Sequence, residues 1–127
     1  MEKEKINEEY SSKGERIIAE ILKKYKISFI HNKEIHLIER HKNKNFRRIW
    51  YPDFCLQDYD LYIEYIGKTN DLDYMEGVRK KIKTFAENKI KVLYIYFDEI
   101  WEQKNSKWYL KKDFEYGLIL RIAFNSQ

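Results

Sequence analysis

In the second half of this 127-residue chain, a helical pattern runs directly into a short apolar segment, and this order limits the available architectures. Between residues 72 and 88, apolar side chains recur at helical spacing on one face: Tyr74, Val78, Ile82 and Phe85. Residues 92–97 follow and are apolar enough to form a buried strand. A strand, a connecting helix and a second strand predict a crossover and a parallel pair. We therefore expect an α/β fold around a mixed sheet.

The rest of the chain supplies one earlier helix and several strands. Residues 12–26 have an apolar helical face, and Ser11 or Ser12 can cap the first turn. β-type sequence is expected over 27–31 and 35–38, followed by two more strands at 49–56 and 60–66, and the overall order is interpreted as α, β, β, β, α, β. A single domain, residues 1–127, is predicted, with a core at about 11–97 and a C-terminal extension, 98–127, packed on it. In the extension, 107–110 is a candidate strand, and 113–124 is either a helix or a last strand.

Composition favours an anionic partner. The formal net charge is +4 and the sequence pI is about 9.0. Basic residues concentrate in the segment 39–48, which we interpret as a hairpin loop that is either solvated or binds phosphates. The candidate nucleic-acid contacts are these basic residues and one later lysine: Arg40, Lys42, Lys44, Arg47, Arg48 and Lys68.

No apolar run approaches the roughly 18 residues needed to cross a bilayer, so no membrane partner is expected. The N-terminal sequence is too acidic and polar for a signal peptide, which predicts an intracellular protein. The single cysteine, Cys55, is interpreted as a buried thiol, and His31, His36 and His41 as ordinary polar residues.

Two acidic residues lie within apolar strand sequence. Asp53 follows Pro52, and Glu64 lies between Ile63 and Tyr65. A carboxylate buried without a partner is destabilising, so its presence in a strand indicates a role. Two carboxylates on neighbouring strands can converge on one hard cation such as Mg²⁺, which prefers oxygen ligands and retains several waters. Such an ion polarises a phosphate and lowers the pKa of an attacking water.

These residues belong to a wider pattern that resembles the PD-(D/E)XK nuclease superfamily. The resemblance runs through Ser12-Lys13-Gly14-Glu15-Arg16, Tyr51-Pro52-Asp53-Phe54 and Ile63-Glu64-Tyr65-Ile66-Gly67. It covers about residues 11–97 and implies a restriction-endonuclease-like αβββαβ core, with helices flanking a mixed central sheet.

One position departs from the family pattern. The family's third motif is Glu-x-Lys, but the residue two after Glu64 is Ile66, which cannot position a water. The chain is most similar to the subgroup with Glu-Tyr-x-Gly, in which the lysine has migrated into the following helix. Tyr74 and Lys81 match that subgroup's spacing, and Lys68 is the alternative substitute.

The resemblance implies a role for each site residue. Asp53 and Glu64, with the Tyr65 carbonyl, would bind Mg²⁺, and Mn²⁺ would substitute for it. Lys81 would orient or deprotonate the water, and Glu15 would reach the metal or its waters from the first helix. Two structural alternatives remain: Glu15 as a helix-capping residue, and Lys81 as a boundary lysine extending to solvent.

The expected function is a metal-dependent DNA endonuclease that leaves a 5′-phosphate. One alternative is a catalytically degenerate module of the same fold that binds nucleic acid or protein, which the missing Glu-x-Lys lysine favours. Another is an RNase on the same scaffold. The small size of the chain suggests that the protein acts as a homodimer or as a component of a larger complex. Aromatic residues of the tail are expected to pack on the sheet or form a dimer interface: Trp101, Trp108, Tyr109, Phe114 and Tyr116.

Overall fold

The computed structural model of the chain describes residues 10–125. Its elements, in chain order, are α2 (Lys13–Lys24), β1 (Ile30–His31), β2 (Ile35–His41), β3 (Lys44–Trp50), β4 (Phe54–Leu56), the 3₁₀ turn η1 (Gln57–Tyr59), β5 (Leu61–Ile66), α3 (Leu72–Glu87), β6 (Val92–Tyr96), α4 (Phe97–Ile100), β7 (Trp101–Lys104), β8 (Lys107–Leu110) and α5 (Phe114–Asn125).

A four-stranded mixed sheet forms the centre, with the strand order β1-β4-β5-β6. β4 pairs antiparallel with both β1 and β5, whereas β5 and β6 pair parallel, connected by α3. The predicted α/β class, the mixed sheet and the parallel pair around a crossover helix are therefore confirmed. Along the chain, the central sheet and its helices follow the order α2, β1, β4, β5, α3, β6.

Apolar layers cover both faces of this sheet, because its central strands alternate their side chains between the two. One layer joins α2, α5 and the inward residues of the strands, including Leu22, Ile63, Ile95 and Leu118. The other is smaller and joins α3 and β2 through Phe85, Ile35 and Leu37. The segment after residue 97 thus contributes to the main core through Phe114, Leu118 and Ile122.

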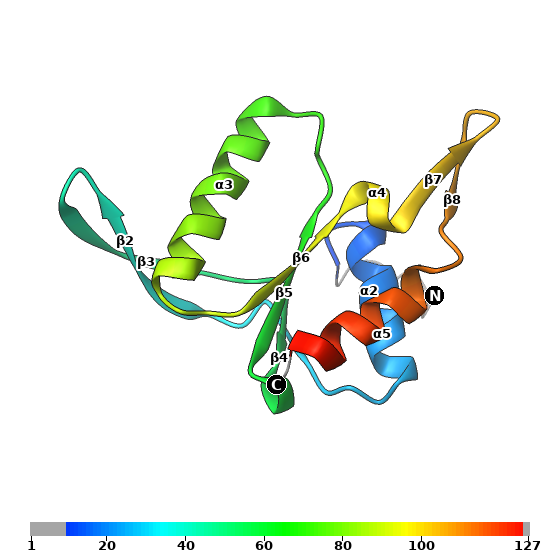
Figure 1. Cartoon of the computed structure of the whole chain (residues 1–127), viewed down its shortest axis with the longest axis horizontal. Coiled ribbons are helices and arrows are strands. Elements are labelled where there is room, and N and C mark those ends of the chain that lie inside the picture. Colours follow the sequence, from blue (N-terminus) through cyan, green and yellow to red (C-terminus); the bar gives the residue numbers. More distant parts are fainter. Residues whose placement is uncertain (1–9, 126–127) are drawn as a thin grey trace.

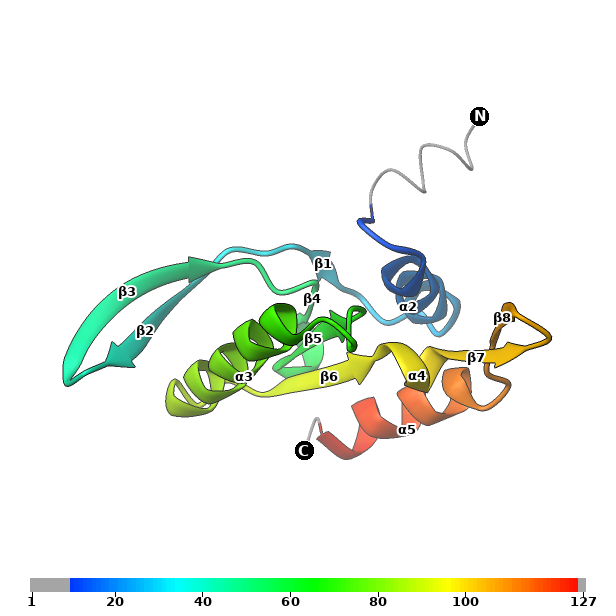
Figure 2. The same cartoon turned by 90° about the horizontal axis from the view of Figure 1, so that it is seen from above.

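Two hairpins extend from opposite ends of the molecule's long axis, β2–β3 at one end and β7–β8 at the other, with β5 and β6 between them (Figures 1 and 2). Each closes through two residues with positive φ, Lys42-Asn43 in the first and Asn105-Ser106 in the second. Such a pair matches the right-handed twist of hairpin strands.

The sequence interpretation of residues 39–48 as a loop is wrong. These residues lie on β2 and β3 and pair in register from Ile35 with Trp50 to His41 with Lys44, except for the two turn residues. The predicted strand 49–56 is also divided: Ile49 and Trp50 end β3, and β4 starts only at Phe54. Pro52 lies in this break, because proline cannot donate a ladder hydrogen bond.

The C-terminal tail contains one strand and one helix. Residues 107–110 form a strand, as expected, and 114–125 form a helix rather than a strand. The packing expected of the tail aromatics holds for Phe114, which is buried, whereas Trp108, Tyr109 and Tyr116 are exposed by 53%, 47% and 68%. Within residues 10–125, every helix is too short or too polar to span a membrane.

Candidate metal and nucleic-acid site

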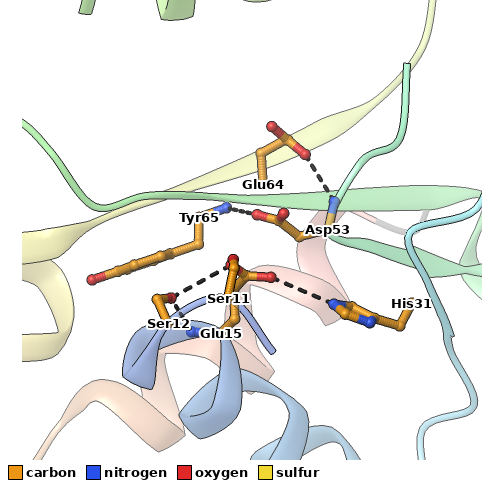
Figure 3. A network of polar contacts seen from close by, with 7 residues as sticks. All are labelled: Ser11, Ser12, Glu15, His31, Asp53, Glu64 and Tyr65. Carbon is orange, nitrogen blue, oxygen red and sulfur yellow. Dashed lines mark hydrogen bonds and ion pairs between the residues drawn. The ribbon is translucent and has the colours of Figure 1, made fainter. Parts of the chain in front are cut away.

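Asp53 and Glu64 are joined through the protein backbone. The Asp53 N–H donates to Glu64 Oε1 at 2.8 Å, and the Tyr65 N–H donates to Asp53 Oδ2 at 2.7 Å (Figure 3). The cause is the antiparallel register of β4 and β5, in which Phe54 lies opposite Ile63. One step further along the same register, Asp53 lies opposite Glu64. Strand pairing therefore fixes Asp53 and Glu64 relative to each other.

Glu15 approaches Asp53 from the other side of β5. In Figure 3 Glu64 lies on one side of this strand, Glu15 lies on the other with the start of α2, and the Asp53 carboxylate is between them. Ser12 caps α2 by accepting the Glu15 N–H at 3.1 Å, and the hydroxyl of Ser11 donates to the Glu15 carboxylate. The capping geometry expected for this helix start is thus present, and it holds an acidic side chain that is only 5% exposed.

His31 completes the surroundings of Glu15 and was not predicted as a site residue. Its Nε2 lies 3.4 Å from Glu15 Oε1, and its ring packs against Tyr10 and Phe54. The pairing of β1 with β4 brings His31 opposite Phe54, next to Asp53 in the chain. Because this pairing joins segments more than twenty residues apart, neither composition nor local spacing indicates it.

Burial and like charges act together on Asp53. Burial raises the pKa of its carboxyl, and the negative charges of Glu64 and Glu15 raise it further, to about 8. The Tyr65 N–H and Lys81 oppose this rise but do not cancel it. A carboxyl group with this pKa resists ionisation until a cation is supplied, because Glu64 and Glu15 already place negative charge near Asp53.

Lys81 provides the cation that contacts Glu64. Its Nζ lies 3.2 Å from Glu64 Oε2, although its side chain remains 45% exposed. Two turns earlier on α3, Tyr74 accepts the Gly67 N–H at 3.4 Å, so both residues of the Tyr-six-Lys spacing reach the end of β5. Lys68 is exposed and, among residues 10–125, forms no ion pair with the three acids.

The ring of Tyr65 lies against two glycines. A Cβ built on Gly14 would lie 2.2 Å from Tyr65 Cζ, and one on Gly67 would lie 2.9 Å from Tyr65 Cε2. Both distances are shorter than any packed structure tolerates. The Gly-Glu start of α2 and the Glu-Tyr-x-Gly end of β5 are therefore complementary parts of one contact.

Comparison with protein-family models, curated proteins and solved structures finds no match for this chain.

A cavity of about 800 Å³ lies beside Glu15 at the start of α2. Glu15 and Tyr65 line it, and the backbone N–H of Tyr65 donates to Asp53. Phe97, Trp101 and Trp108 also line it, and the sequence did not mark these three as site residues. Its volume is within the range of about 300–1,000 Å³ that is usual for small-molecule sites.

Five of the six predicted phosphate-binding residues lie apart from this cavity, whereas Lys68 lines it. Arg40, Lys42, Lys44, Arg47 and Arg48 are on the β2–β3 hairpin, whose outer half extends into solvent (Figure 1). Arg48 is partly engaged, because its guanidinium lies 3.3 Å from the Glu39 carboxylate and over the ring of Phe46. The hairpin, residues 35–50, contains five of the 25 basic residues and one of the 21 acidic ones. Because the remaining sequence holds 20 of each sign, the entire net charge of +4 belongs to this hairpin.

The donor set suits a cation that is largely hydrated. Within residues 10–125, no group of three or more His, Cys, Asp or Glu side chains is arranged to bind a metal ion. Asp53 and Glu64 nevertheless supply hard oxygen donors from two segments that their backbone hydrogen bond joins. Mg²⁺ is commonly held by one or two carboxylates with water completing its shell. These residues therefore fit Mg²⁺ or Mn²⁺ better than a metal that requires a protein cage.

Proposed function

We propose that this protein is a divalent-metal-dependent endonuclease that hydrolyses phosphodiester bonds in DNA. The observation that supports this most strongly is the convergence of Asp53, Glu64 and Lys81, from three separate segments, at one end of β5. The order α2, β1, β4, β5, α3, β6 and the Gly14–Tyr65 contact add support for the PD-(D/E)XK resemblance.

Asp53, Glu64 and the Tyr65 carbonyl would bind Mg²⁺, which supplies Lewis-acid stabilisation of the phosphate and a more acidic water. Lys81 already contacts Glu64, so its ammonium group is close enough to orient the attacking water and hold a proton. Glu15, on the other side of β5, acts through Asp53 and through water rather than as a direct neighbour of Glu64.

The β2–β3 hairpin would provide most of the affinity for the nucleic-acid backbone. It is positively charged, it extends from the body, and most of its basic side chains are exposed. Phosphate contacts of this kind fix the position of the substrate and contribute no sequence preference.

A second candidate is a non-catalytic nucleic-acid-binding module. Two observations favour it: Ile66 occupies the usual lysine position, and one oxygen of each site carboxylate already accepts a backbone N–H. The nuclease is preferred because Lys81 replaces the charge that Ile66 lacks.

The test is a cleavage assay with supercoiled, single-stranded and branched DNA and with RNA, in Mg²⁺, Mn²⁺ or EDTA. Wild-type protein is compared with Glu64→Gln and with Glu76→Gln, an exposed acid on α3 that pairs with Arg79. We expect metal-dependent cleavage of DNA that Glu64→Gln lacks and Glu76→Gln retains. Absence of cleavage with every substrate, together with retained binding at low salt, would favour the module. Cleavage confined to RNA would favour an RNase.

A further inference from the structure

We propose that the cavity bounded by Tyr65, Phe97 and Trp108 binds an unpaired nucleobase of the DNA substrate. This inference rests on the proposed function and specifies its substrate as DNA with a single-stranded segment beside the cleaved bond. It assigns a binding role to the β7–β8 hairpin, to which the catalytic proposal gives none.

The walls of the cavity are aromatic on several sides. Phe97 and Trp108 meet edge to face with ring centroids 4.9 Å apart, and both line the cavity with Tyr65, Tyr74 and Trp101. Base–aromatic stacking tolerates any sequence, because every base has a π-face. A cavity lined in this way is suited to a flat, partly polar ring.

Trp108 is an exposed aromatic residue that lines the cavity. It is 53% exposed, whereas Trp101 on the paired strand packs against the main core. The two lie on strands of one short hairpin, in which Trp108 is opposite Gln103. An exposed indole beside a cavity is available to a ligand in a way that a core indole is not.

The charges of the lining favour an anionic ligand, because Lys13, Arg16 and Lys68 are basic and Glu15 is the acid among the lining residues. Lys13 and Lys68 line the cavity, are exposed, and form no ion pair among residues 10–125. A nucleotide combines a stacking ring with a phosphate, so it matches the aromatic walls and the two ammonium groups together.

Tyr65 connects the cavity to the carboxylate site. Tyr65 contributes its ring to the wall of the cavity and its backbone N–H to Asp53. The basic β2–β3 hairpin lies at the other end of the molecule (Figures 1 and 2). A strand running from that hairpin across Asp53 would therefore place its continuing nucleotides at Trp108. Duplex DNA cannot offer a base to the cavity without unpairing it.

The experiment measures equilibrium binding in EDTA, so that cleavage plays no part. A labelled 12-nucleotide oligo-dT and a blunt 12-base-pair duplex are each titrated with wild-type protein and with Trp108→Ala, Trp108→Phe and Tyr116→Ala. Tyr116 is the control because it is an exposed aromatic residue on α5 outside this cavity. We expect Trp108→Ala to weaken oligo-dT binding about five-fold or more, as the loss of one stacked base implies. Trp108→Phe should recover most of the affinity, and Tyr116→Ala should match wild type.

Binding of the blunt duplex separates this inference from the proposed function. Trp108→Ala should leave duplex affinity unchanged, since the hairpin still binds the phosphates. Equal oligo-dT affinity of wild type and Trp108→Ala would overturn the inference, even if the protein proved to be a nuclease. A Trp108-dependent preference for oligo-dT in a protein that cleaves nothing would support the cavity assignment while contradicting the nuclease.

Discussion

The backbone N–H of Asp53 donates to the carboxylate of Glu64 at 2.8 Å, so the two acids are fixed relative to each other before any cation is bound. The carboxylate of Asp53 is held in turn by the Tyr65 N–H at 2.7 Å. Strand pairing, rather than side-chain packing alone, thus sets the site geometry. The carboxylates of Asp53, Glu64 and Glu15 are buried or half-buried and repel one another, so the stability of the fold should depend on pH.

We predict that the metal-free protein loses stability as pH rises. The pKa of Asp53 in the folded protein is about 8, above the ordinary value of 3.8. A raised pKa means that folding favours the protonated form. The stability that protonated Asp53 contributes to the folded protein is fully present below about pH 4 and is lost as pH rises towards 8. Asp53→Asn stays neutral and retains the Tyr65 hydrogen bond.

Urea unfolding in EDTA at pH 5 and pH 8.5 measures this effect. Relative to Asp53→Asn, wild type should lose a few kcal/mol between these values, since one pKa unit corresponds to about 1.4 kcal/mol. Identical pH profiles for the two proteins would show that Asp53 is an ordinary carboxylate.

Lys81→Met should lower the cleavage rate by about 100-fold or more, the range expected for loss of a group that positions or transfers a proton. Binding of Mn²⁺ should change little, because the two carboxylates remain. Lys80→Met, on the exposed face of the same helix, is the matched control. If Lys68→Met is inactive and Lys81→Met is fully active, the lysine assignment is wrong.

The close approach of Gly14 to Tyr65 predicts opposite effects of two glycine substitutions. Gly14→Ala forces a displacement of the Tyr65 ring and should reduce the free energy of unfolding by roughly 1–3 kcal/mol. Gly77→Ala, in α3 where nothing lies within 4 Å, should be neutral or stabilising by up to about 1 kcal/mol. Urea denaturation compares the two variants directly. Equal stability of both would contradict the packing of Tyr65 on α2.

Much of the site follows from local sequence patterns. Asp53 and Glu64 lie in segments joined by a short turn, so an antiparallel pairing brings them together. Lys81 lies on the face of α3 that its helical spacing predicts. The strands of the basic hairpin are not predicted, because β3 is exposed along most of its length and so lacks the apolar alternation of a half-buried strand. His31 and Trp108 depend on pairings and surface shape that no local pattern encodes.

The basic β2–β3 hairpin should control the salt dependence of nucleic-acid binding. Lys42→Gln with Arg47→Gln should weaken DNA binding and reduce the slope of log K against log salt by about 0.9 for each phosphate that the hairpin no longer neutralises. Lys26→Gln with Lys112→Gln changes the net charge equally at exposed positions outside the hairpin. A fluorescence-anisotropy titration between low and moderate salt compares them. Equal slopes for the two double variants would exclude the hairpin as the main phosphate-binding element.

The central claim is that Asp53 and Glu64 form a metal-dependent catalytic centre. Its most direct test is the rate of cleavage of end-labelled DNA as a function of Mn²⁺ concentration, with Mn²⁺ binding measured on the same wild-type and Asp53→Asn preparations. We predict that the wild-type rate saturates over the concentrations at which Mn²⁺ binds, and that Asp53→Asn loses both binding and cleavage. Cleavage by Asp53→Asn at the wild-type rate, or no Mn²⁺ binding by the wild type, would contradict the claim.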